Sequence, residues 1–205
     1  MKVVLSKNTV QSIGSKVEEI KFSNQSTGLR VIKFKDIIED DEPTYAKIKN
    51  LEIHNAKISV EVLSRLLPDA PEHARGFIGV TFRIDENDSE FEGMYLRPTN
   101  SKCDIQLRRN RSTQYFSYPN FKFYHSRESN PGEYESYADI DLNQWIEMTI
   151  VIQDQEASLY LNKHKEPVLV VKDLKYGPNK KGSIGLWVDV GTEGYFKNLT
   201  VEKKD

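Results

Sequence analysis

Apolar and polar residues alternate along most of this chain, with a period of two residues. In the run 77–84, one face carries Ile78, Val80, Phe82 and Ile84, and the other carries Phe77, Gly79, Thr81 and Arg83. Such alternation is typical of a β-strand with one face buried. The same pattern predicts further strands at 32–35, 56–62, 91–97, 104–109, 114–118, 145–153, 157–162 and 167–171. A succession of short strands with almost no helix indicates an all-β fold.

The end of the chain makes this prediction more specific. Residues 182–188 and 194–201 are two β-rich runs with a short turn of Gly, Asp and Thr residues between them. We interpret them as the last hairpin of a jelly roll, an antiparallel sandwich of two sheets. Polar segments at 39–43, 67–74, 85–90 and 126–132 have turn chemistry, and no change of composition divides the chain. We therefore expect one jelly-roll domain over residues 1–205.

Charge and apolar content exclude several kinds of partner. The chain has 29 Lys and Arg against 31 Asp and Glu, a formal net charge of −2, which gives no overall attraction to nucleic acid. We interpret the local basic group Lys102, Arg108, Arg109 and Arg111 as a solvated face. No run approaches the ~18 apolar residues of a membrane span, so we expect no membrane partner. The single cysteine, Cys103, excludes an intrachain disulfide and fits a reducing compartment.

The sequence contains no motif for a signal peptide, a metal or a cofactor. Only residues 3–5 are apolar before the chain becomes polar, which predicts a cytoplasmic protein, although an export signal removed earlier would leave the same sequence. The histidines lie far apart and no glycine-rich phosphate loop is present, so we expect no metal and no cofactor. Asp85, Asp88 and Glu90 offer oxygen ligands without the spacing of an EF-hand, which leaves calcium binding open.

A series of motifs follows in order along the chain. They are residues 77–83, Glu92, 95–98, 114–119, 131–136, Trp145, 167–174 and the Gly-Leu-Trp of 185–187. In this order, residues 45–203 resemble the concanavalin A-like lectins and glucanases, and especially the laminin-G-like bacterial modules grouped near the 3-keto-disaccharide hydrolase-like domains. The resemblance implies one convex and one concave sheet, with carbohydrate as the commonest ligand. The first 45 residues resemble the superfamily only as strands that lead into the sandwich.

Sugar binding requires an aromatic face against which a ring can stack, and planar groups that hydrogen-bond its hydroxyls. The candidates on strands expected near the concave sheet are Tyr95, Arg97, Gln114, Tyr115 and Trp187. We predict that they bind an oligosaccharide or glycan. An alternative for Arg97 is an ion pair with Glu133 or Glu135 that fixes the loop 118–137, and an alternative for Trp187 is a place in the core.

The segment 115–137 is unusually rich in aromatic residues. They are Tyr115, Phe116, Tyr118, Phe121, Phe123, Tyr124, Tyr134 and Tyr137. A long connection of this kind is usually functional or disordered, and its aromatic content argues against disorder. We predict a folded excursion at the rim of the concave face. The alternative is a satellite cluster that only seals a sheet edge.

Glycoside hydrolysis requires two carboxylates that flank the scissile bond. Laminarinase-type members of the superfamily carry them on one strand as Glu-x-Asp-x-x-Glu or Glu-x-Asp-x-Glu, and this chain lacks that motif. Glu90 and Glu92 share a face by period two, so a catalytic pair is physically possible, but we favour a solvated acidic loop that leads into a strand. The sequence thus predicts a carbohydrate-binding or carbohydrate-processing module. A glycoside hydrolase with unplaced carboxylates and a protein-interaction module without a glycan role are the alternatives, and whether the chain is an enzyme stays open.

Overall fold

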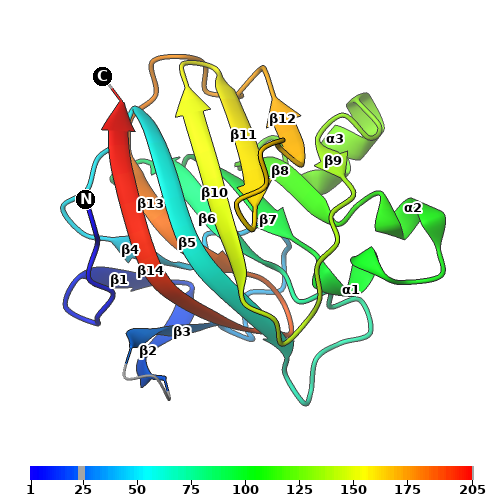
Figure 1. The fold of residues 1–205 in the computed structure, drawn as a ribbon, viewed down its shortest axis with the longest axis horizontal. Helices are drawn as coiled ribbons and strands as arrows, with labels where there is room; N and C mark the ends of the chain where they lie inside the picture. The colour runs from blue at the N-terminus through cyan, green and yellow to red at the C-terminus, as the bar shows by residue number, and fades with distance from the viewer. Residues whose placement is uncertain (23–25, 205) are drawn as a thin grey trace.

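The computed structural model describes residues 1–22 and 26–204, and they form two antiparallel sheets (Figure 1). Sheet A consists of β2 (Ser15–Lys21), β3 (Thr27–Lys33), β5 (Asn55–Leu66), β10 (Ile146–Gln153), β11 (Glu156–Leu161), β12 (Leu169–Val171) and β14 (Thr192–Lys204). Sheet B consists of β1 (Val10–Ile13), β4 (Tyr45–Ile48), β6 (Ile78–Ile84), β7 (Phe91–Leu96), β8 (Thr113–Tyr118), β9 (Glu135–Ser136) and β13 (Ser183–Val188). The helices are α1 (Pro98–Ser101), α2 (Gln106–Arg109) and α3 (Phe123–Ser129).

The strand order shows how the sheets are built. Sheet A runs β12-β11-β10-β5-β14-β3-β2, and sheet B runs β1-β4-β13-β6-β7-β8-β9. In Figure 1, β10, β5 and β14 lie in front of β6, β7 and β13, and the helices lie on the side of β8 and β9. The predicted all-β jelly-roll sandwich is confirmed. Within the described residues, no helix is both long and apolar enough to cross a membrane, and the predicted cytoplasmic location stays a prediction.

The inner faces of the two sheets form the main core. Ile58, Val60 and Val62 of β5 point inward from sheet A, and Val80 and Met94 point inward from sheet B. Each of these side chains is at most 1% exposed. Burial of a whole aliphatic side chain stabilises the fold by roughly 1.5–3 kcal/mol. The alternation that predicts the strands therefore also selects the core residues.

The opposite, outer face of sheet B carries a second buried group. This outer aromatic cluster consists of Tyr45, Ile84, Phe91, Tyr95, Phe116 and Trp187. The ring centroid of Trp187 lies 4.8 Å from that of Tyr95 and 5.2 Å from that of Phe116. Gly93 makes room for these rings, because a Cβ atom there would lie 2.6 Å from Cε1 of Phe116. Both faces of sheet B are thus packed.

Two segments meet across the outer face and cover the cluster: the connection 34–44, and residues 118–129, which include α3. The indole Nε1 of Trp187 donates to the carbonyl of Glu42 at 2.8 Å. The carboxylate of Glu42 pairs with Lys122, and the carboxylate of Asp41 accepts the Phe123 N–H at 2.8 Å. These contacts join the segments to each other and to the sheet. The cluster is consequently buried beneath them, and a pocket lies at one end of the covered face.

A β-bulge corrects the predicted faces of β6. Ser183 pairs with Ile84 and Gly185 pairs with Thr81, so the register shifts between them. Arg83 has a φ of 54°, and its guanidinium donates to the carbonyl of Asp154 at 2.6 Å. Ile84 in turn joins the outer aromatic cluster. The prediction that Ile84 shares a face with the preceding apolar residues was wrong, because a bulge breaks the period of two.

Two other predictions need correction. Residues 106–109 form α2 rather than a strand, and Ile105 and Leu107 are 54% and 57% exposed. Alternation predicts a strand only where a sheet edge can bury one face, and none covers these side chains. The final two runs are not a hairpin, since β13 belongs to sheet B and β14 to sheet A. The turn between them instead carries the chain from one sheet to the other.

Candidate functional site

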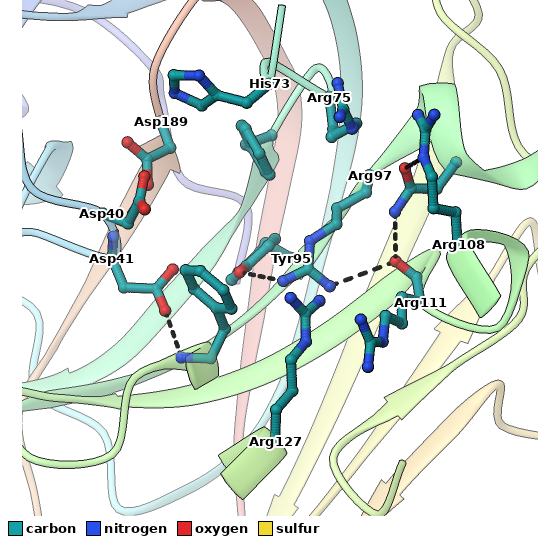
Figure 2. Close-up of a pocket in the computed structure, with 13 residues that line it drawn as sticks. Asp40, Asp41, His73, Arg75, Tyr95, Arg97, Arg108, Arg111, Arg127 and Asp189 are labelled. Atoms are coloured by element: carbon teal, nitrogen blue, oxygen red, sulfur yellow. Dashed lines mark hydrogen bonds between the residues drawn. The ribbon is translucent and has the colours of Figure 1, made fainter. Parts of the chain in front are cut away.

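A pocket of about 370 Å³ lies at the end of sheet B where β6 begins and where β7 and β13 end. Its lining consists of Asp40, Asp41, His73, Arg75, Phe77, Tyr95, Arg97, Asn100, Arg108, Arg111, Phe123, Arg127 and Asp189. In Figure 2, the aspartates and His73 lie on one side and the arginines on the other. The pocket is therefore divided by charge into an acidic and a basic side.

Asp189 anchors the acidic side. Its carboxylate pairs with Lys33, and both side chains are 3% exposed. The backbone N–H groups of Asp41 and Val190 donate to it at 2.9 Å and 2.7 Å. A buried carboxylate needs such partners, because an unpaired buried charge is strongly destabilising. Asp189 thus fixes the segment that carries Asp40 and Asp41 to the end of β13.

Asp41 is a buried carboxyl group with an unusual protonation equilibrium. Burial raises its pKa to about 7, and the negative charge of Asp189 acts in the same direction. The Phe123 N–H and the positive charge of Arg97 oppose this shift without cancelling it. The pKa of Asp40 is also raised, chiefly by burial. Near neutral pH, Asp41 can therefore either donate or accept a hydrogen bond.

Arg97 stands at the centre of the basic side. Its guanidinium donates to the Tyr95 hydroxyl at 2.7 Å and to Oε1 of Gln114 at 3.0 Å. It also pairs with Glu135 at 3.1 Å. The same carboxylate contacts Arg111 at 3.1 Å and Arg127 at 2.9 Å. One buried carboxylate thus holds three guanidinium groups in place.

The other two arginines of the pocket contact neutral groups. Arg75 donates to the backbone carbonyls of Glu72 and Ala74 at 2.6 Å and 2.8 Å. Arg108 donates to the side-chain oxygen of Asn100 at 3.2 Å. Across residues 1–22 and 26–204, neither has a carboxylate within ion-pair distance. Their charges face the pocket without a counter-ion from the chain.

The predicted site residues separate into groups. Tyr95 and Arg97 line the pocket. Gln114 and Trp187 are fully buried beside them, Gln114 as an acceptor for Arg97 and Trp187 as a packing partner of Tyr95. Tyr115 points to the inter-sheet core, where its hydroxyl donates to Glu92 at 2.6 Å. Contact of any of these residues with a ligand stays a prediction. Tyr95 and Arg97 reach the pocket wall although they are only 1% and 3% exposed, and the other three could contact a ligand only if the structure opened.

The segment 115–137 contributes to both sides of sheet B. Tyr115 and Tyr134 join the main core, with ring centroids 5.6 Å apart. Phe116 belongs to the outer aromatic cluster, and Phe123 reaches the pocket. The segment therefore includes features of both predicted alternatives, a rim of a pocket and a cluster against the sheet.

Sequence reasoning missed most of the pocket. Asp40, Asp41, Arg75, Arg127 and Asp189 lie outside the strands, where no periodicity marks their direction. The basic group at 102–111 indicated part of the pocket, because Arg108 and Arg111 line it. The acidic run 39–42 indicated another part, since it supplies the opposite side. Neither signal indicates that the two segments lie close together.

The carboxylates first considered for catalysis lie elsewhere. Glu92 is fully buried on the inner face of sheet B, and its pKa is raised, chiefly by burial. Its Oε2 lies 3.6 Å from Arg83. Glu90 precedes β7 and pairs with Lys180. Within the described parts of the chain, no group of three or more His, Cys, Asp or Glu side chains is placed to hold a metal ion.

Comparisons with known proteins identify the fold. Carbohydrate-binding module CBM66 from Bacillus subtilis superposes with a TM-score of 0.58 at 12% identity, over 94% of this chain and 98% of that one. A proposed glycosyl hydrolase from Parabacteroides distasonis gives 0.55 at 11% identity, over 98% and 91%. A Bacillus subtilis protein of unknown function with a galectin-like fold gives 0.53 at 12% identity, over 93% and 86%. No family model and no curated protein sequence matches the chain. The fold is thus a jelly roll of the kind that these three structures share.

Proposed function

We propose that this protein is a carbohydrate-binding module and that its glycan site is the pocket lined by Tyr95 and Arg97. The observation that supports this best is the pocket itself, which presents fixed hydrogen-bonding groups of both kinds at one end of the covered face of sheet B. Its volume falls within the ~300–1,000 Å³ of small-molecule sites. The structural likeness to a carbohydrate-binding module agrees with this proposal at the level of the fold.

The chemistry of the pocket suits a sugar. Hydroxyl groups both donate and accept, so they need acceptors such as Asp40 and Asp41 and donors such as Arg97. Phe77 and Phe123 add apolar surface to the lining, which can pack against the C–H face of a ring. Arg97 is already held by Tyr95, Gln114 and a carboxylate. Such preorganisation lowers the entropic cost of binding.

A glycan array tests this proposal. We expect wild-type protein to bind a defined set of glycans, and Asp40→Asn to weaken that binding by about tenfold, the scale for a hydrogen bond to a charged group. Asp36→Asn is the matched control, because Asp36 is exposed on the same segment and does not line the pocket. Equal loss in both variants, or no glycan binding by the wild type, would refute the site.

A second candidate is a glycoside hydrolase. It is favoured by Asp41, whose pKa of about 7 suits a general acid and whose backbone N–H donates to the carboxylate of Asp189. A panel of chromogenic glycosides separates the two functions. Turnover that Asp41→Asn abolishes would support the hydrolase. Glycan binding without turnover of any glycoside would support the binding module.

A further inference from the structure

The positive charge of the pocket exceeds what the chain itself neutralises. We define the arginine wall as Arg75, Arg97, Arg108, Arg111 and Arg127, the arginines that line the pocket. Glu135 is the one carboxylate within 4.0 Å of any of them in residues 1–22 and 26–204. On the opposite side, Asp189 already has its own partner in Lys33. The wall therefore keeps most of its charge for something outside the chain.

The arginines also crowd one another. Burial lowers the pKa of Arg75, and the charges of Arg108 and Arg97 lower it further. Burial likewise lowers the pKa of Arg111, together with the charge of Arg127. Guanidinium groups nevertheless stay protonated at physiological pH. Gathering like charges in a partly dry pocket is unfavourable, and an anion bound between them would relieve that repulsion.

We propose that the saccharide bound in this pocket carries an anionic group, the carboxylate of a uronic acid or a sulfate ester, which the arginine wall holds. This inference rests on the proposed glycan-binding function and specifies its ligand class. A guanidinium presents a planar fork of donors that matches the oxygens of such a group. Arg75 and Arg108, which contact only neutral oxygens, are the groups best placed to pair with it.

The acidic side of the pocket narrows the ligand further. A free anion or a phosphate chain would gain nothing from Asp40 and Asp41, whereas sugar hydroxyls can donate to them. The two sides face each other across one cavity (Figure 2). A single sugar unit with hydroxyls at one end and an anionic group at the other satisfies both. The charge division therefore also fixes the orientation of the bound unit.

Calorimetry with matched saccharides tests the inference. The anionic probes are oligomers of galacturonate, glucuronate and mannuronate, and sulfated galactose oligomers. The neutral counterparts are the same uronate oligomers after reduction of each carboxyl to a hydroxymethyl group. Inorganic sulfate is the probe for a free anion. We expect at least one anionic oligomer to bind at least ten times more tightly than its neutral counterpart, and the difference to shrink as salt is raised. Binding by inorganic sulfate as tight as by any saccharide would overturn the inference.

The outcomes separate this inference from the proposed function. Neutral oligomers, or neutral glycans on the array, that bind as tightly as anionic ones would refute the anionic group while leaving the glycan site intact. No binding of any saccharide would refute the proposed function, and the inference with it. Preference for uronates over sulfated oligomers, or the reverse, identifies which anionic group the pocket takes.

Neighbouring arginines on α2 provide a matched pair of variants. Arg108→Gln removes a charge from the wall, whereas Arg109→Gln removes one that contacts Gln106 and the carbonyl of Cys103 outside the pocket. We expect Arg108→Gln to weaken binding of the preferred anionic oligomer by about ten- to a hundredfold, and Arg109→Gln to change it less than twofold. The melting temperatures of both variants serve as the folding control. Equal affinity in the two variants would count against the wall.

Discussion

Arg97 has a position that fits both of the roles that the sequence analysis treated as alternatives. It lines the pocket, and it pairs with Glu135 as a structural contact between β7 and β9. Its side chain is 4% exposed. A ligand group would therefore meet a guanidinium that Tyr95 and Gln114 already orient. The hydrogen bonds that stabilise the fold are thus the ones that would orient Arg97 for recognition under the proposed function.

We predict that Arg97→Ala lowers the free energy of unfolding by about 3 kcal/mol, because it breaks a buried ion pair. Glycan affinity of the folded protein should fall as well, by about 1–3 kcal/mol. Arg97→Lys should rescue neither, since an ammonium group cannot reproduce the planar fork. Thermal melting and calorimetry on one preparation measure both effects. A destabilised protein with unchanged affinity would assign Arg97 a purely structural role.

Asp41 should make stability depend on pH in a defined direction. Its pKa is about 7 in the folded protein and 3.8 when unperturbed, so between these values the folded state binds more protons than the unfolded state. The contribution of this group to stability is then present below about pH 4 and is lost as the pH rises to about 7. Asp41→Asn removes the titration. Between pH 4 and pH 8, the wild type should therefore lose up to a few kcal/mol of unfolding free energy relative to Asp41→Asn. Urea denaturation of both proteins at each pH measures this change. A constant difference would contradict the assignment.

At the scale of elements, the covered outer face of sheet B is the feature that positions the site. Segments 34–44 and 118–129 meet over the outer aromatic cluster, joined by the pair of Lys122 and Glu42. The pocket lies at one end of this covered face. Packing of this face depends on Gly93, which faces the ring of Phe116. Loss of that packing would disturb the cover and the pocket together.

We predict that Gly93→Ala lowers the free energy of unfolding by about 1–3 kcal/mol, the usual cost of overpacking. It should also change the near-ultraviolet circular dichroism, because the rings of the cluster must shift. Met94→Leu, on the same strand but in the main core, conserves volume and should cost less. Similar stability and spectra for Gly93→Ala and wild type would show that the cluster is loosely packed.

At the scale of the whole molecule, the central strands of both sheets contribute side chains to the inter-sheet core. Several strand pairings join distant parts of the sequence, such as β5 with β14 and β4 with β13. Two sheets assembled in this way share one apolar interior. Neither sheet can keep its inner face buried without the other.

We therefore predict a single cooperative unfolding transition, with coincident midpoints by fluorescence and far-ultraviolet circular dichroism. The result tests the expectation of one domain over residues 1–205. Reductant should leave the midpoint unchanged, because Cys103 is the only cysteine. Two separate transitions would indicate that part of the chain folds independently.

The sequence by itself determined most of the long strands and their faces, but it did not locate β1, β2, β4 or β9. Met94 and Tyr95 alternate between the inner and outer faces of β7 as period two requires. The same rule failed at Ile84, where a bulge intervenes, and at Leu107, where no partner strand is present. Local pattern reports the direction of a side chain only while the backbone stays regular.

Only the tertiary structure decided the site. Asp41, Arg97 and Asp189 come from a loop, the end of β7 and the end of β13, and lie far apart in the sequence. Their meeting depends on which strands pair and on how two loops fold over the outer face. No local periodicity encodes these choices, because they follow from packing between segments distant in the chain. The sequence therefore specified a sandwich, and the packing of that sandwich made the pocket and its separated charges.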